Sequence, residues 1–169
     1  MIREIYFAGG CFWGTEHFFK QVRGVVETAT GYANGRTENP TYEEVYTDQT
    51  GYAETVRVRY DDAVVSLDFL VRMFFCAIDP TSLNQQGEDK GTRYRTGVYY
   101  TCEDDLEVIR RVFGDEQQKI TDTIVVELEP LRNFTQAEEY HQDYLDKNPD
   151  GYCHLPLSLF EFARKANDS

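Results

Sequence analysis

Hydrophobic and polar positions alternate along most of the chain in patterns that predict strands and helices in turn. Period-two alternation or short apolar runs predict strands at residues 2–8, 25–33, 55–60, 96–101 and 123–130. Apolar residues at helical spacing predict four helices. Two lie near 14–22 and over 135–145, one runs from a Ser66 cap through Ile78, and one runs from a Thr101/Asp104 cap through Phe113.

This interleaving of strands and helices predicts an α/β fold, a two-layer sandwich of one mixed β-sheet with flanking helices. No repeat and no linker rich in Pro, Gly or Ser divides the sequence, so residues 1–169 are expected to form a single domain. Two polar stretches, 31–42 and 79–95, fit neither pattern. Loops of that length in a compact domain are usually functional or disordered, and their Tyr, Arg and Asp content favours a function.

Composition narrows the class of protein. The formal net charge of −13 disfavours binding to nucleic acid or to an anionic membrane surface. No apolar stretch approaches the roughly 18 residues of a membrane span, and the first residues lack the pattern of a secretory signal. Four scattered cysteines are too few for a disulfide scaffold. We therefore expect a reduced, cytoplasmic protein, and with no apolar face left over we expect a monomer.

The stretch FAGGCFWGTEH, residues 7–17, carries the first chemical signal. Cys11 follows an apolar strand and precedes a helical pattern, so it is expected at a helix N-terminus, where the dipole favours the nucleophilic thiolate. Gly9 and Gly10 permit close approach of a ligand. Position alone leaves a small buried structural cysteine equally open. The neighbouring Phe12 and Trp13, the chain's only tryptophan, favour an apolar pocket beside a reactive thiol.

Five segments, taken in order, resemble the A-type peptide methionine sulfoxide reductases. They are GGCFWGTEHFF, GYANGRTENPTYEEV, TGYAETVRVRYD, DPTSLNQQGEDKGTRYR and EEYHQDYLDKNPDGYCH. The resemblance spans about residues 6–154 and implies a mixed α/β fold. It also implies reduction of the S epimer of methionine sulfoxide, free or in oxidised proteins, with thioredoxin recycling the enzyme and no cofactor or metal.

The resemblance assigns roles that the chemistry requires. Cys11 is the nucleophile, and Phe12 and Trp13, with Gly10 beside them, form a slot for the methyl group. Oxygen leaves the sulfoxide poorly unless it is protonated or strongly hydrogen-bonded, so an acid and other donors are needed.

The resemblance supplies the acid and the donors as well. Glu54 is the acid, Tyr42 and Tyr94 are phenolic donors, and Asp89 orders water or Tyr94. Without the resemblance each has an ordinary interpretation: a solvated carboxylate, packed tyrosines and a turn residue. To act as an acid, Glu54 needs a raised pKa, which a water-poor aromatic pocket would provide.

Cys153 completes the proposed chemistry. A thiol that takes oxygen becomes a sulfenic acid, and a second thiol can condense with it to a disulfide. By the resemblance Cys153 is this resolving cysteine, in a C-terminal tail, residues 149–169, that is expected to be mobile. We interpret Cys76 and Cys102 as packing residues.

Three positions depart from the family pattern. Tyr52 and Ile78 stand where histidine is usual, and Arg93 where glutamine is usual. An arginine near Glu54 would favour the ionised carboxylate and oppose its role as an acid.

Other classes of function remain open on the residues alone. A cysteine hydrolase or acyltransferase would pair Cys11 with His141 or His154 as base. A thiol peroxidase would use the same two cysteines on peroxide. A metal site is weaker, because Cys153 and His154 have no partner pair at ligand spacing.

Overall fold

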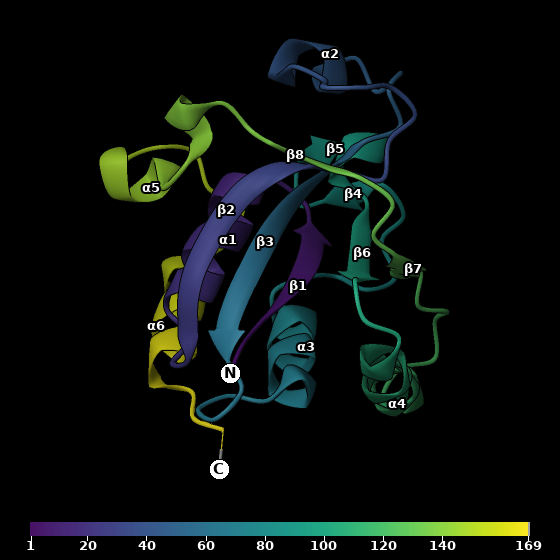
Figure 1. Ribbon diagram of the computed structural model, residues 1–169, viewed down its shortest axis with the longest axis vertical. Coiled ribbons are helices and arrows are strands. Elements are labelled where there is room, and N and C mark those ends of the chain that lie inside the picture. The colour runs from purple at the N-terminus through teal and green to yellow at the C-terminus, as the bar shows by residue number, and fades with distance from the viewer. Residues whose placement is uncertain (169) are drawn as a thin grey trace.

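The computed structural model describes residues 1–168, and its centre is one curved six-stranded β-sheet (Figure 1). Its strands are β1 (Ile2–Gly9), β2 (Val25–Ala33), β3 (Ala53–Asp61), β6 (Thr96–Tyr100), β7 (Glu127–Pro130) and β8 (Phe134–Gln136). A separate short hairpin is formed by β4 (Gln85–Gln86) and β5 (Asp89–Lys90).

The helices lie between and after these strands. They are α1 (Phe12–Lys20), α2 (Tyr42–Tyr46), α3 (Leu67–Cys76), α4 (Asp104–Gln118), α5 (Tyr144–Lys147) and α6 (Leu157–Lys165). Two 3₁₀ turns occupy Thr92–Tyr94 and Glu139–His141.

The strand order β7-β6-β1-β3-β2-β8 places β1 and β3 at the centre of the sheet. Every neighbouring pair is antiparallel except β6 and β7, which are parallel, so the sheet is mixed as predicted. Because β1 and β3 are antiparallel, the end of β1 lies beside the start of β3. The GGCFW stretch that follows β1 and the GYAE stretch that leads into β3 therefore meet at the same end of the sheet.

The two faces of the sheet are covered differently. On one face, Phe7 of β1 stacks on Phe19 of α1 at 4.5 Å between ring centroids and on Phe74 of α3 at 5.0 Å. On the other face, Tyr6 meets Phe134 edge to face at 5.0 Å, and this smaller cluster also contains Tyr99. The buried apolar residues of the helices belong to the cluster on the first face, and the smaller cluster contains none of them, so the helices of residues 1–168 form the second layer on one side only. The two-layer α/β prediction is confirmed.

The predicted helix caps have mixed outcomes. Ser66 caps α3 as expected, since its hydroxyl accepts a hydrogen bond from the Phe69 N–H at 3.1 Å. The cap predicted at Thr101/Asp104 is wrong, because α4 follows Glu103 and has no side-chain cap. The predicted strand at 123–130 is shorter, with only its last four residues in β7.

The helix predicted over 135–145 is wrong. This segment instead contains part of β8, a 3₁₀ turn and the start of α5. The Ala137 N–H donates to the Thr30 carbonyl, and the Gln142 side chain bonds both the N–H and the carbonyl of Thr30. These contacts with the edge of β2 satisfy polar groups that a continuous helix would have used locally.

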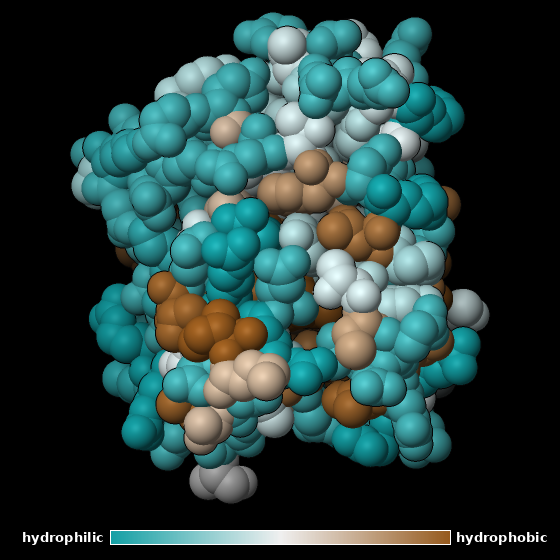
Figure 2. All heavy atoms as spheres, in the orientation of Figure 1, coloured by the Kyte–Doolittle hydropathy of each residue, from teal (hydrophilic) through white to brown (hydrophobic). Residues whose placement is uncertain are grey.

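The C-terminal tail contains α6, whose Phe160 and Ala163 are buried. The mobility expected for residues 149–169 stays a prediction. On the face shown in Figure 2, hydrophobic residues form separate patches among hydrophilic ones. No helix within residues 1–168 is long and apolar enough to cross a membrane.

Candidate active site

Cys11 occupies the sharp turn from β1 into α1, as predicted. Gly10 has φ +89°, a conformation that favours glycine, and Cys11 is the residue that precedes the first turn of α1. The Thr15 hydroxyl fastens this turn, since it lies within hydrogen-bonding distance of the Gly9 and Cys11 carbonyl oxygens at 3.1 and 3.2 Å. The thiol is therefore held just beyond the end of the central strand β1, with only 6% of Cys11 exposed.

The ionisation of Cys11 differs from the prediction. The backbone N–H groups of Trp13 and Gly14 bond the sulfur and favour the thiolate, as expected of a helix N-terminus. Burial outweighs them, and with the nearby Glu54 and Asp89 carboxylates it raises the pKa of the Cys11 thiol well above its ordinary value. Near neutrality Cys11 is therefore a thiol that carries its proton.

Glu54 lies at the start of β3, beside the Cys11 turn. It shares the helix-covered face of the sheet with Val56, because the two are separated by one strand period. Its Oε1 accepts a hydrogen bond from the Phe12 N–H at 3.1 Å, and only 1% of Glu54 is exposed. Burial raises the pKa of Glu54 to about 8. The side chain is thus a protonated carboxylic acid near neutrality, as the acid role requires.

Arg93 does not ionise Glu54, although it acts in the direction expected. Its positive charge lowers the pKa of Glu54, but the effect of burial is larger. The guanidinium forms an ion pair with Asp48 and lies over the rings of Tyr46 and Tyr94, with its Cζ 4.2 and 4.3 Å from their centroids. Arg93 therefore also holds Tyr94 in place.

The other two departures lie at the margin of the site. Tyr52 turns its ring over Gly35 and donates its hydroxyl to the Thr37 carbonyl oxygen. Ile78 packs near Gly9, at the end of β1.

Tyr42 and Tyr94 come from the two polar stretches and converge on the same site. Tyr42 opens α2, and its N–H donates to the Glu138 carboxylate at 3.0 Å, which ties α2 to the chain after β8. Burial, followed by the charge on Glu54, raises the pKa of both phenols, and the Cys11 sulfur contributes in the same direction. Both hydroxyls therefore keep their protons and can donate hydrogen bonds.

Phe12 and Trp13 form aromatic walls together with residues that the sequence analysis did not assign to the pocket. The Trp13 indole N–H donates to Nδ1 of His141 at 3.0 Å, and its ring stacks on Tyr144 at 3.8 Å. His141 also lies 5.2 Å from Phe12 and 4.4 Å from Tyr42, ring to ring. The signal that could have found His141 is its place among aromatics in EEYHQDY.

Asp89 lies in the β4–β5 hairpin, and its Oδ1 accepts a hydrogen bond from the Tyr152 hydroxyl at 2.9 Å. That Asp89 orders water or Tyr94 stays a prediction. Its Oδ2 is buried, with no partner among residues 1–168. Gln86 anchors this hairpin by bonding the N–H and the carbonyl of Asp79. Asp89 thus connects the hairpin to the segment that carries Cys153.

Cys153 lies against the first turn of α1. A Cβ added to Gly14 would sit 3.1 Å from the Cys153 sulfur, and the Gly14 N–H bonds the Cys11 sulfur. Gly14 therefore touches both sulfurs, although they are far apart in sequence. Cys153 also lines a cavity of about 310 Å³ with residues of α1, α5 and α6, among them His17, Leu145 and Phe160.

The two remaining cysteines lie outside this site. Cys76 is exposed at the end of α3, so its interpretation as a packing residue is wrong, and Cys102 is half-buried. No group of three or more His, Cys, Asp or Glu side chains in residues 1–168 is arranged to hold a metal ion.

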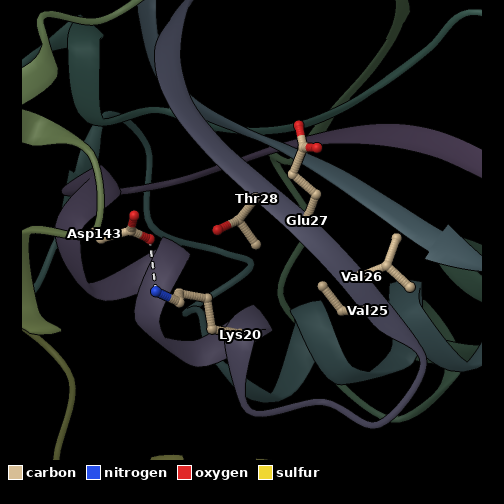
Figure 3. Close-up of a pocket in the computed structure, with 6 residues that line it drawn as sticks. All are labelled: Lys20, Val25, Val26, Glu27, Thr28 and Asp143. Atoms are coloured by element: carbon tan, nitrogen blue, oxygen red, sulfur yellow. Dashed lines mark hydrogen bonds and ion pairs between the residues drawn. The ribbon is translucent and has the colours of Figure 1, made fainter.

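Another pocket, of about 290 Å³, contains none of the predicted site residues (Figure 3). It lies between α1 and β2, and Lys20 and Asp143 form an ion pair of 2.6 Å on one side of it. We therefore centre the candidate active site on Cys11.

The arrangement suits transfer of an oxygen atom to sulfur better than the rival chemistries. A hydrolase requires a histidine nitrogen at the thiol, but within residues 1–168 no hydrogen bond joins the Cys11 sulfur to His141 or His154; the Trp13 and Gly14 N–H groups bond it instead. A buried carboxylic acid and two phenols have no use in that reaction. They suit a substrate oxygen that must be protonated as it leaves.

Comparisons with known proteins give a consistent result. Residues 3–168 match the family model described as peptide methionine sulfoxide reductase. The chain is 53% identical over 160 residues to peptide methionine sulfoxide reductase MsrA of Clostridium acetobutylicum, covering 95% of this chain and 99% of that relative. It is 51% identical over 166 residues to the MsrA of Lachnoclostridium phytofermentans, covering 98% and 100%.

Solved structures agree. Mxr1 from Saccharomyces cerevisiae in reduced form superposes with a TM-score of 0.87 at 40% identity, covering 92% of each chain. Methionine sulfoxide reductase A of Corynebacterium diphtheriae gives 0.87 at 38%, covering 90% of this chain and 77% of that one. Mxr1 in complex with Trx2 gives 0.61 at 28%, covering 85% and 84%.

Proposed function

The chain belongs to the peptide methionine sulfoxide reductase family, and we propose on that premise that Cys11 is its nucleophile, Glu54 its acid and Cys153 its resolving thiol. The protein is an oxidoreductase that uses thiols to reduce methionine sulfoxide and is recycled by thioredoxin. The residues that carry out each step are assigned from the contacts and charges described above.

In the first step the Cys11 sulfur attacks the sulfur of the sulfoxide. The oxygen moves to Cys11, which becomes a sulfenic acid, and methionine leaves as the reduced product. The Glu54 carboxyl protonates the substrate oxygen, Tyr42 and Tyr94 donate hydrogen bonds to it, and the Cys11 proton replaces the one that Glu54 gave. One thiol and one sulfoxide thus give one sulfenic acid and one thioether, with no further reactant.

In the second step the Cys153 thiol displaces the hydroxyl of the sulfenic acid, which leaves as water, and a Cys11–Cys153 disulfide forms. Thioredoxin then reduces this disulfide by thiol–disulfide exchange. The cavity beside Cys153 supports this assignment, because it gives a reductant access to that sulfur from outside the active site.

A single observation carries the proposal. A carboxyl group that is almost fully buried, with a pKa raised to about 8, is hydrogen-bonded to the residue that follows a buried thiol. A carboxylic acid that keeps its proton at neutral pH is rare in proteins, and beside a sulfur nucleophile it fits a leaving oxygen.

The test is incubation with each epimer of methionine sulfoxide and a dithiol, followed by quantification of methionine. The S epimer is expected to be reduced and the R epimer to remain. Cys11→Ser serves as the matched control, since a hydroxyl is a poor nucleophile towards sulfoxide sulfur and no methionine should form. Turnover by Cys11→Ser would refute the assignment of the nucleophile.

We further propose that the enzyme acts in the cytoplasm as a monomer and that it repairs oxidised proteins as well as free methionine sulfoxide. Four free cysteines, with a proposed redox cycle that needs thiols, suit a reducing compartment. Gel filtration and assays with an oxidised protein as substrate check the last two statements.

A further inference from the structure

His154 is a half-buried histidine that the mechanism above does not use. Its Nε2 lies 3.1 Å from the Gly9 carbonyl oxygen, at the end of β1. Its Nδ1 is buried and has no hydrogen-bond partner within residues 1–168. A buried polar atom without a partner is costly, so it is retained where it has a task.

The hydrogen bond to Gly9 determines the chemical state of the other ring nitrogen. A carbonyl oxygen can only accept, so Nε2 carries the hydrogen and donates it. Burial lowers the pKa of His154, although Asp89 and the Gly9 carbonyl act in the opposite direction, and the ring is therefore neutral near pH 7. In this tautomer Nδ1 is a free lone pair that can accept a proton.

Gly14, in the first turn of α1, brings this lone pair and the resolving thiol to the same point of the backbone. A Cβ added to Gly14 would lie 3.0 Å from Nδ1 of His154 and 3.1 Å from the sulfur of Cys153. A Cβ added to Gly10 would lie 3.1 Å from Nε2. The imidazole and the Cys153 thiol thus both pack against backbone that has no side chains. We call this surface, formed by Gly10 and Gly14, the glycine seat.

We propose that His154 accepts the proton of Cys153 as the Cys11–Cys153 disulfide closes, while the glycine seat holds both groups beside Cys11. This rests on the proposed function, because it requires Cys153 to be the resolving thiol. The proton passes from the Cys153 sulfur to Nδ1, the S–S bond forms as the S–O bond of the Cys11 sulfenic acid breaks, and the hydroxyl leaves as water with the proton that His154 took up.

The need for such an acceptor follows from the surroundings of Cys153. Burial and the nearby Asp89 raise the pKa of its thiol above its ordinary value, so little thiolate forms unaided near neutrality. Asp89 of β5 and the Gly9 carbonyl of β1 act on His154, and the Cβ and Cγ of Gln86 in β4 lie near the same point of Gly10 as Nε2 of the imidazole. The Gly9 carbonyl is already paired with Nε2, whereas Nδ1 of the neutral imidazole has no partner within residues 1–168 and can take the proton.

The experiment compares His154→Gln with the parent protein. Glutamine keeps an N–H donor for the Gly9 carbonyl but has no nitrogen that accepts a proton near neutrality. Both proteins receive one equivalent of methionine sulfoxide without reductant, and rapid-quench mass spectrometry follows conversion of the Cys11 sulfenic acid to the disulfide. The closure rate is counted only among chains that have released methionine. We expect closure to slow by about 10²-fold, the lower end of what a positioned proton acceptor contributes.

The pH profile separates proton transfer from a merely structural role. In the parent, closure should level off near pH 7, because the pKa of His154 lies below its ordinary 6.5. In His154→Gln, closure should keep rising beyond pH 8, because Cys153 must ionise by itself. Closure at the parental rate, or slower closure with the parental pH profile, would overturn the role of His154 as proton acceptor.

A matched pair of glycine variants tests the role of the glycine seat. Gly14→Ala should slow closure, because the new methyl group meets both Cys153 and His154, whereas Gly114→Ala in α4 meets nothing within 4 Å and should close normally. Equal rates of disulfide closure in the two variants would overturn the role of the glycine seat in holding Cys153 and His154. Failure of the proposed function is seen separately, as continued thioredoxin-dependent cycling by Cys153→Ser.

Discussion

Replacement of Glu54 by glutamine tests the central feature of the active site. The substitution keeps the shape of the side chain and an oxygen that can accept the Phe12 N–H, a bond of 3.1 Å in the native protein. It removes only the transferable proton. Any change in reduction rate is therefore a measure of acid catalysis, provided that the fold is retained.

The magnitude follows from the pKa of about 8. At pH 7 roughly nine in ten Glu54 side chains carry a proton, and above pH 8 the protonated fraction falls about tenfold per pH unit. The rate of sulfoxide reduction in the parent should fall with it. Glu54→Gln should be slower at pH 7 by roughly 10²–10⁴-fold and should lack this decline.

Although Glu54→Gln should lower the rate of reduction, it should raise the free energy of unfolding. The folded pKa of Glu54 lies above its ordinary 4.5, so the folded state holds the proton more tightly than the unfolded state. Its stabilising contribution is complete below pH 4.5 and is lost as pH rises towards 8. By pH 7 the loss is roughly 3 kcal/mol, which glutamine avoids because it has no charge to bury. Glu54→Gln should therefore gain stability over the parent between pH 5 and 8.

The assay pairs single-turnover methionine release with urea unfolding at each pH. Glu16→Gln is the matched control, because Glu16 is also 1% exposed, has a pKa raised by burial to about 7, and is bonded to Thr28 and Asp143, outside the active site. Glu16→Gln should show the gain in stability and keep the alkaline decline in rate. Near-parental turnover of Glu54→Gln across neutral pH would remove Glu54 from the mechanism.

Three further predictions concern the pocket, the redox pair and the core. Trp13→Ala should raise KM by roughly 10–200-fold, the value of a lost apolar contact, while thermal unfolding stays cooperative; unfolding as the main effect would make Trp13 a core residue. Cys153→Ser should release about one methionine per chain and then stop as the sulfenic acid, counted by rapid quench, whereas Cys11→Ser should release none. Leu70→Ala, in the fully buried part of α3, should lower the free energy of unfolding by roughly 2–5 kcal/mol in urea; a loss near zero would contradict the packing described for α3.

Local patterns were sufficient for most elements and for the identity of the reactive group. The alternation in β3 and the spacing of apolar residues in α3 both depend on near neighbours, and both were predicted correctly. The two glycines before Cys11 likewise indicated a tight turn, which Gly10 forms with φ +89°. The helix predicted around Gln142 failed because its side chain bonds Thr30, a partner 112 residues away that no local pattern contains.

The sequence by itself therefore determined most strands and helices up to β7, the family and the set of residues with suitable chemistry. Only the tertiary structure decided their ionisation and their partners, because both depend on burial and on contacts between distant segments. A helix N-terminus favoured a thiolate at Cys11, whereas burial raises the pKa of that thiol; burial also supplies the raised pKa that the acid role of Glu54 requires, and it outweighs the opposing charge of Arg93. The proximity of Cys153 and His154 to Gly14 arises in the same way, from folding of the C-terminal segment against α1.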